Sequence, residues 1–151
     1  KFNRLRMVIA GGTEAAPFAK QFAERNISVI VNPSPMGEGA FDEFDGYDVS
    51  LAAALAEEEV TVLIGSGGRS AGASRDLSLL AAMAVGGGLE REHALAAITS
   101  GPAKVFGLTS HGTVEFGKQA DLLILDGQPL STRTSVQAVL VDGRVVVEPK
   151  E

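Results

Sequence analysis

Three stretches of the chain repeat one order of elements: a short apolar run, a break rich in glycine or proline, and a helical pattern. The apolar runs cover residues 5–10, 27–31 and 60–64, and none of them alternates with polar positions. Continuously apolar strands are typical of a parallel sheet covered on both faces. Because parallel strands need crossovers that contain a helix, residues from about 5 to 85 are predicted to form three consecutive β/α units.

Each run is followed by residues with helical spacing. Thr13 is predicted to cap a helix that carries Phe18 and Phe22 on one face, and Ser50 to cap a second helix over residues 51–59. A third helix is expected to stop at the glycines of 86–88, since its apolar residues have the spacing i, i+3, i+4 and i+7: Leu77, Leu80, Ala81 and Ala84.

The remainder of the chain has a different pattern. A short helix over 89–98 is expected to end at the Ser-Gly-Pro of 100–102, and residues 103–106 suggest another short turn. Short β segments follow at 122–125, 136–141 and 145–147. Asp142-Gly143 between the last two is a strong hairpin signal. This tail is predicted to be a small antiparallel unit.

Three β/α units do not close a barrel and would leave two strand edges unpaired. The remaining strands are therefore expected from a missing N-terminal half or from a second copy, which makes a homo-oligomer one possibility. The start, Lys1-Phe2-Asn3, has no initiator methionine and no signal-peptide pattern. We therefore expect either a removed leader or the distal part of a longer polypeptide.

Composition narrows the function classes. The 151 residues are 45% hydrophobic, with a net charge of −6, two histidines and no cysteine. This composition excludes disorder, disulfides and cysteine-ligated metals. The negative charge argues against a nucleic-acid partner. No apolar run is long enough to cross a bilayer, so a soluble protein is expected, with its compartment open between cytoplasm and periplasm or secretion.

Ligands of parallel β/α folds bind at the carboxyl ends of the strands. Three loops lie there, and the substrate-facing candidates that they supply are Thr13, Glu14, Asn32, Ser66 and Arg69. The glycine-rich segment 65–72 could cradle a phosphate, but it matches neither the dinucleotide fingerprint nor the P-loop. A tight turn is the favoured interpretation, and a phosphate or nucleotide binder stays an alternative.

The other candidates for chemistry favour structural roles. His93 lies among charged residues of a short helix and His111 in a turn, so neither is expected at a strand end. The acidic segment 38–48 lacks the spacing of an EF-hand. Asp76 is expected at a helix start, where an acid is favoured by the helix dipole. Glu14 is expected to point toward the strand ends, although Thr13-Glu14 is also an ordinary helix start.

Three motifs in the second half resemble those of amidohydrolases. Positions 96–99 (AAIT), 102–104 (PAK) and 107–108 (GL) resemble the family's AxxxxTxNPAxxLGL stretch. Positions 112–127 resemble its GxxxxGKxADLVVLDG signature, and 139–145 resemble its closing hairpin. The resemblance covers 89–147 well, with the imidazolonepropionase-like branch as the nearest in pattern.

The resemblance implies a (β/α)8 barrel of the TIM type with a small composite β-sandwich built from both chain ends. It also implies hydrolysis of C–N bonds with zinc or another divalent metal that lowers the pKa of a bound water. Such families place an aspartate after the eighth strand and a histidine after the sixth. Here Gly67 takes the place of the aspartate, and residues 10–14 contain no histidine.

Together these expectations predict the domain organisation and the function of the chain. Residues 1–108 would be the last three β/α units of a barrel with the helices that follow, and 109–151 a segment of the sandwich. The predicted function is that of the C-terminal portion of an amidohydrolase-like hydrolase acting on C–N bonds other than simple peptide bonds. No catalytic residue, metal ligand or cofactor is expected on this segment. The alternative is a non-catalytic assembly or small-molecule-binding module that pairs through open barrel edges.

Overall fold

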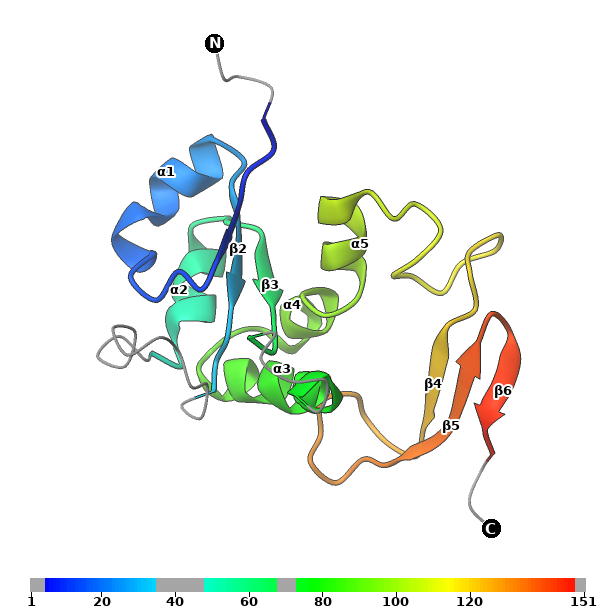
Figure 1. The fold of residues 1–151 in the computed structure, drawn as a ribbon. Coiled ribbons are helices and arrows are strands. Elements are labelled where there is room, and N and C mark those ends of the chain that lie inside the picture. The colour runs from blue at the N-terminus through cyan, green and yellow to red at the C-terminus, as the bar shows by residue number, and fades with distance from the viewer. Residues whose placement is uncertain (1–4, 35–47, 68–72, 149–151) are drawn as a thin grey trace.

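The first sheet of the computed structural model has three parallel strands in the order β1–β2–β3 (Figure 1). The structure describes residues 5–34, 48–67 and 73–148. Because β2 pairs in parallel with both neighbours, the predicted parallel arrangement is confirmed. Each strand is shorter than the apolar run that predicted it: β1 (Val8–Ala10), β2 (Ser28–Val31) and β3 (Val62–Ile64).

The register brings the carboxyl ends of the three strands to one edge of the sheet. Ala10 lies opposite Ile30, and Val31 lies opposite Ile64. The ladder continues beyond the strands, because the Gly11 N–H donates to the Ile30 carbonyl oxygen at 3.0 Å and the Gly65 N–H donates to that of Val31 at 2.9 Å. The residues that follow each strand therefore stay close together.

Helices flank the sheet. In Figure 1, α1 and α2 lie to one side of the three strands, and α4 and α5 lie to the other. Contacts join α2 to β3 and to η1, and both α3 and α5 to β3. The bounds are η1 (Ala16–Phe18), α1 (Ala19–Glu24), α2 (Leu51–Glu57), η3 (Ala73–Asp76), α3 (Leu77–Gly86), α4 (Arg91–Ala96) and α5 (Ser100–Phe106).

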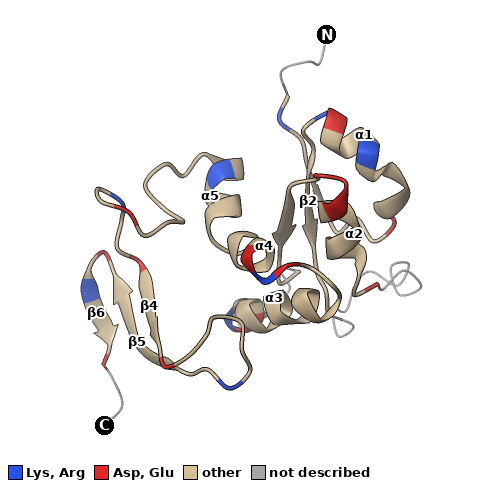
Figure 2. Cartoon of the chain, turned by 180° about the vertical axis from the view of Figure 1, so that it is seen from behind, with Lys and Arg blue, Asp and Glu red and all other residues tan. Residues whose placement is uncertain are grey.

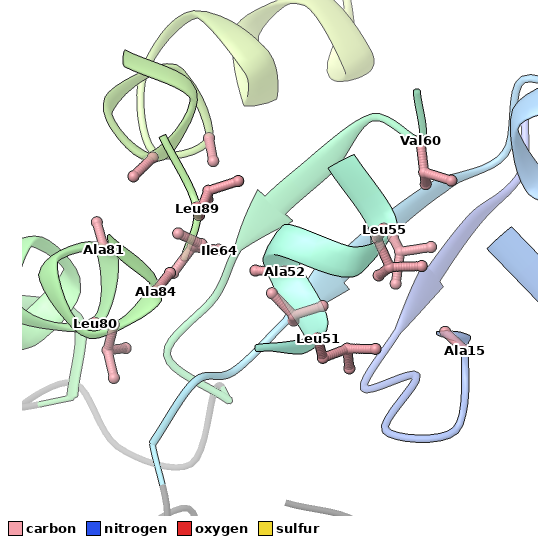
Figure 3. Close-up of a cluster of buried hydrophobic side chains, with 14 of the residues drawn as sticks. Ala15, Leu51, Ala52, Leu55, Val60, Ile64, Leu80, Ala81, Ala84 and Leu89 are labelled. Atoms are coloured by element: carbon pink, nitrogen blue, oxygen red, sulfur yellow. The ribbon is translucent and has the colours of Figure 1, made fainter. Parts of the chain in front are cut away.

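The core lies between the sheet and these helices (Figure 3). Its largest fully buried side chains are Leu55, Leu63 and Val29. The three strands and α3 carry no charged side chain, as Figure 2 shows. Burial of β2 and β3 on both faces explains why their sequences do not alternate.

The predicted third helix is confirmed as α3, with its apolar stripe turned inward. Leu80, Ala81 and Ala84 are buried, whereas Leu79 is 49% exposed. The helix ends at Gly86, as the glycine run predicted.

The second sheet is antiparallel, with the order β4–β5–β6. Its strands are β4 (Leu122–Leu125), β5 (Val136–Val141) and β6 (Arg144–Val147). The predicted hairpin is confirmed: Asp142 and Gly143 have φ values of 51° and 74°, and they join β5 to β6. Two consecutive residues with positive φ are the requirement of the tight turn that suits the twist of a hairpin.

The prediction that Thr13 caps the first helix is wrong. Gly11 and Gly12 take φ values of 93° and 57°, and the Ala15 N–H donates to the Gly12 carbonyl oxygen at 2.9 Å. This turn uses the residues after β1, so the first helical residue is Ala16, in η1. The helix therefore starts later than the sequence predicted.

The predicted end of the short helix over 89–98 is also only partly right. The helix α4 ends at Ala96, but Ser100, Gly101 and Pro102 begin α5 instead of forming a break. Proline is tolerated in the first turn of a helix, because an N–H there has no partner within the helix. The same tripeptide signal therefore marks a helix start here.

Ser50 immediately precedes α2 as predicted, but its side chain does not cap the helix. The Ser50 hydroxyl donates to Asp48 Oδ1 at 2.6 Å, and the Ser50 N–H donates to the same oxygen at 2.8 Å. The Asp48 carboxylate thus accepts the hydrogen bond of the Ser50 hydroxyl, which was expected to cap the helix.

These two bonds, the side-chain bond first, hold the pKa of Asp48 below its ordinary value. A pKa lowered by folding adds stability above the unfolded-state pKa, and that stability is lost as the pH falls through the folded-state pKa. Ser50→Ala removes the hydroxyl and keeps the backbone bond. The pKa of Asp48 is therefore expected to rise without regaining its ordinary value. Titration of the Asp48 carboxyl carbon by NMR checks this, and an unchanged pKa would contradict it.

None of the helices in the described ranges is long and apolar enough to cross a membrane.

Candidate functional site

The carboxyl-end edge of the first sheet, defined as residues 11–14, 32–34 and 65–67, holds most of the candidates that the sequence supplied. Thr13 is half-buried and Glu14 is exposed, both in the turn after β1. Asn32 follows β2 directly, and Ser66 follows β3, each half-buried. The segment that contains Arg69 lies outside the described residues. The structure thus gathers four of the five candidates at one edge, three of them partly shielded from solvent.

Asn32 occupies the centre of this edge. Continuing the strand register by one residue sets it beside Gly65, because Val31 lies opposite Ile64. Asn32 also shares a sheet face with Ile30, two residues earlier. A Cβ at Gly65 would lie 2.8 Å from Ile30 Cγ2, so Gly65 faces the same side and has no room for a side chain.

A hydrogen bond fixes the oxygen end of the Asn32 carboxamide. Its Oδ1 accepts a hydrogen bond from the Ser34 N–H at 3.1 Å. This bond fixes the orientation of the carboxamide, because an N–H must face the oxygen. Nδ2, which carries two N–H donors, then points toward Gly67: a Cβ at position 67 would lie 3.2 Å from it.

Gly67 has a φ of 77°, in the left-handed region that favours glycine. An aspartate at this position would need a strained backbone, and it would also meet the Asn32 carboxamide. The backbone after β3 is therefore arranged for glycine at the position where the resemblance leads one to expect a carboxylate.

The side chains at the carboxyl-end edge do not fit a zinc site. They offer the hydroxyls of Thr13, Ser34 and Ser66, the carboxamide of Asn32 and the exposed carboxylate of Glu14, whereas zinc is bound by thiolate, imidazole and carboxylate. Among residues 5–34, 48–67 and 73–148, no three His, Cys, Asp or Glu side chains are close enough together to hold a metal ion. Apart from the Glu14 carboxylate, the described side chains of this edge are therefore neutral hydrogen-bonding groups.

The two histidines lie elsewhere. His93 Nδ1 is 3.6 Å from Glu90 Oε2 on the surface of α4, with 63% of the histidine side chain exposed. His111 Nε2 is 3.8 Å from Asp121 Oδ2, and its Nδ1 shares a hydrogen bond of 2.9 Å with Ser110 Oγ. Neither histidine lies at the carboxyl-end edge, as the sequence predicted.

Sequence reasoning missed the grouping of Ser110, His111 and Asp121. His111 lines two cavities of about 880 and 740 Å³, and Asp121 lines the second of them. Thr113 lines both as well, and its buried Oγ1 has no hydrogen-bond partner among the described residues. Asp121 is oriented by the Asp142 N–H, which donates to its Oδ1 at 2.8 Å. No spacing in the sequence indicates these contacts, because strand pairing between β4 and β5 brings Asp142 to Asp121.

Comparison with known proteins identifies relatives of this fold. Residues 68–147, more than half of the chain, match the sequence profile described as "Amidohydrolase family". A search of curated proteins found no match. The architecture is mixed α/β and similar to that of solved amidohydrolases, as the sequence predicted.

Three solved structures illustrate the similarity. An amidohydrolase from Thermotoga maritima MSB8 is 30% identical, with a TM-score of 0.83 over 93% of this chain and 37% of its own. A zinc-bound adenosine deaminase from Xanthomonas campestris is 21% identical, with a TM-score of 0.64 over 97% and 38%. A beta-aspartyl dipeptidase from Fervidobacterium islandicum AW-1 is 18% identical, with a TM-score of 0.64 over 94% and 39%. The last two likenesses concern the fold alone, and the chain spans less than half the length of each of these proteins.

Proposed function

The chain belongs to the amidohydrolase family, and on that premise we propose that it forms the C-terminal portion of a hydrolase of C–N bonds other than simple peptide bonds. In this proposal its carboxyl-end edge contacts substrate and supplies no metal ligand. The observation that carries it is the family match together with Gly67, whose left-handed backbone follows β3 where the family resemblance implies a carboxylate. We also propose that the chain belongs to the imidazolonepropionase-like branch of the family.

The finer architecture belongs to the same proposal. Residues 1–108 would supply three β/α units and the following helices to a (β/α)8 barrel, and 109–151 would supply strands to a β-sandwich. Parallel pairing of β1, β2 and β3 supports the first part. Support for the second comes from β4, where Leu123 and Ile124 point to opposite faces of the sheet and are 54% and 48% exposed. A sheet with apolar side chains on both faces needs cover on both.

Metal chemistry would have to come from outside this segment. A zinc ion lowers the pKa of its bound water and so creates a nucleophile at neutral pH. The side chains of Thr13, Asn32 and Ser66 would instead orient a substrate by hydrogen bonds. Arg69 and the exposed Glu14 are further candidates for contact with the substrate. The chain by itself is therefore expected to bind amides without hydrolysing them.

A hydrolysis assay tests this proposal. The purified chain is incubated with a panel of linear and cyclic amides, with and without added zinc ions, and ammonia or amine release is measured. No release above the rate of the buffer is expected in either condition. Zinc-dependent turnover by residues 1–151, lost in Ser66→Ala and Asn32→Ala, would overturn the proposal, because it would require a complete metal site in this segment.

A second candidate function is an assembly or small-molecule-binding module, and one observation favours the assembly reading. β1 is at the edge of its sheet, and the residues before it leave Leu5 and Met7 67% and 51% exposed. An open parallel edge with apolar side chains is a surface that another chain can extend. In this candidate a second copy pairs there and gives a homodimer.

Sedimentation separates the two candidates. If assembly is the function, the chain sediments as a tight dimer, and Met7→Glu shifts it to monomer because a charge would be buried at the junction. Leu79→Glu, on the exposed side of α3, serves as the control and should leave the dimer intact. A monomer over the whole concentration range would contradict the assembly function.

A further inference from the structure

We propose that the Asn32 carboxamide occupies the space of a side chain at position 67, so that the carboxyl-end edge presents a neutral amide donor where a metal-ligating carboxylate would otherwise lie. The inference deepens the proposed function and rests on it for the role of the edge in substrate contact. It says more than that a metal ligand is missing from position 67. One residue, Asn32, takes the space of that ligand and supplies a hydrogen-bond donor there.

The structure leaves little room for a side chain at position 67. A Cβ at position 67 would lie 3.2 Å from Asn32 Nδ2, a separation at which one of the two groups has to move. Asn32 has little freedom to do so, because the Ser34 N–H holds its Oδ1 at 3.1 Å. The left-handed φ of 77° at Gly67 adds a backbone cost for any other residue. Asparagine at 32 and glycine at 67 are therefore a matched pair.

Among the described residues, the positions beside Asn32 leave its half-buried carboxamide partly exposed. Gly65 and Gly67, on the side of β3, carry no side chains to cover it, and a Cβ at Gly65 would meet Ile30 Cγ2 at 2.8 Å. Within the part of the chain that the structure describes, no hydrogen bond from Nδ2 is found, whereas Oδ1 is already engaged. The group left free is a donor, which selects an oxygen acceptor such as the carbonyl of an amide.

A cycle of substitutions tests the shared space. Gly67→Ala is expected to lower the melting temperature by about 4–8 °C, the shift that a combined backbone and contact cost of about 2 kcal/mol produces in a chain of this size. In an Asn32→Ala background the drop should be smaller, because only the backbone cost remains. Equal drops in both backgrounds would show that Asn32 does not occupy the space, and the inference would fail.

Gly117→Ala is the matched control for this cycle. Gly117 has a φ of 84°, and a Cβ there would meet nothing within 4 Å, so its substitution carries the backbone cost without the contact. Its effect should be the same in the parent chain and in the Asn32→Ala chain, and should resemble that of Gly67→Ala in the Asn32→Ala chain. A dependence of Gly117→Ala on the residue at position 32 would mean that the coupling reports general destabilisation, which would also overturn the inference.

The donor is tested with acetamide, a neutral carbonyl acceptor, by following side-chain amide resonances in NMR. The Asn32 Nδ2 resonance is expected to move and saturate, and the resonance of Asn26, before the amino end of β2, to stay in place. If both move together in proportion to acetamide, the edge has no accessible donor site and the inference fails. Because the cycle and this titration need no turnover, they can fail while the hydrolysis assay still supports the proposed function, and the two failures are therefore distinguishable.

Discussion

Leu55→Ala is expected to lower the free energy of unfolding by about 3–5 kcal/mol, the range for a leucine whose cavity cannot collapse. Leu55 is fully buried in α2, in the cluster that joins the first sheet to its helices (Figure 3). The Val60 N–H donates to the Leu55 carbonyl oxygen at 3.1 Å, so the backbone on this side is tied to the entry of β3. Local relaxation into the vacated volume is therefore restricted.

Urea unfolding followed by circular dichroism measures this cost, with Leu79→Ala as the matched control. Leu79 is also a helical leucine, but it is 49% exposed on α3. Its replacement should cost less than about 1 kcal/mol, since only part of its apolar surface is removed from contact. Equal costs for the two variants would contradict the placement of the core between sheet and helices.

Gly87→Ala is expected to cost about 2–3 kcal/mol, at the upper end of the range for overpacking. A Cβ at position 87 would lie 2.0 Å from the carbonyl oxygen of Val49, so backbone atoms have to move. The φ of Gly87 is −83°, an ordinary value. The expected cost therefore comes from the close approach of two chain segments and not from the backbone conformation.

Gly86→Ala separates this effect from helix propensity. Gly86 is the last residue of α3, and a Cβ there would meet nothing within 4 Å. Alanine at a helical position is favoured over glycine by about 0.5–1 kcal/mol, so Gly86→Ala should be neutral or stabilising. Thermal unfolding of both variants checks the pair. A loss from Gly86→Ala as large as that from Gly87→Ala would show that the approach of Val49 is not the cause.

Much of the fold could be predicted because its signals are local. The predominantly apolar runs predicted the parallel strands, and Asp142-Gly143 predicted the turn between β5 and β6. Helix starts were less predictable, since neighbouring residues compete for the same groups. The glycine turn after β1 displaced the cap expected at Thr13, and Asp48 accepted the Ser50 hydroxyl.

The candidate site, too, could be predicted only where its features are local in sequence. Position at a strand end is a local property, and it identified Thr13, Asn32 and Ser66 as residues of one edge. The approach of Asn32 to Gly67 depends on the register between β2 and β3, which a single sequence does not specify. The approach of His111 to Asp121 also joins residues that are distant in sequence. Contacts of this kind follow from the packing of elements and have no local signature.

The most direct measurement is the metal content of the purified chain after equilibration with zinc ions and dialysis. The donors of the carboxyl-end edge are hydroxyls, a carboxamide and one exposed carboxylate, which are weak zinc ligands in this number. We expect far less than one zinc per chain and no change in the NMR resonances of Thr13, Asn32 and Ser66. One tightly held zinc per chain, with those resonances shifted, would contradict the absence of a metal site at this edge.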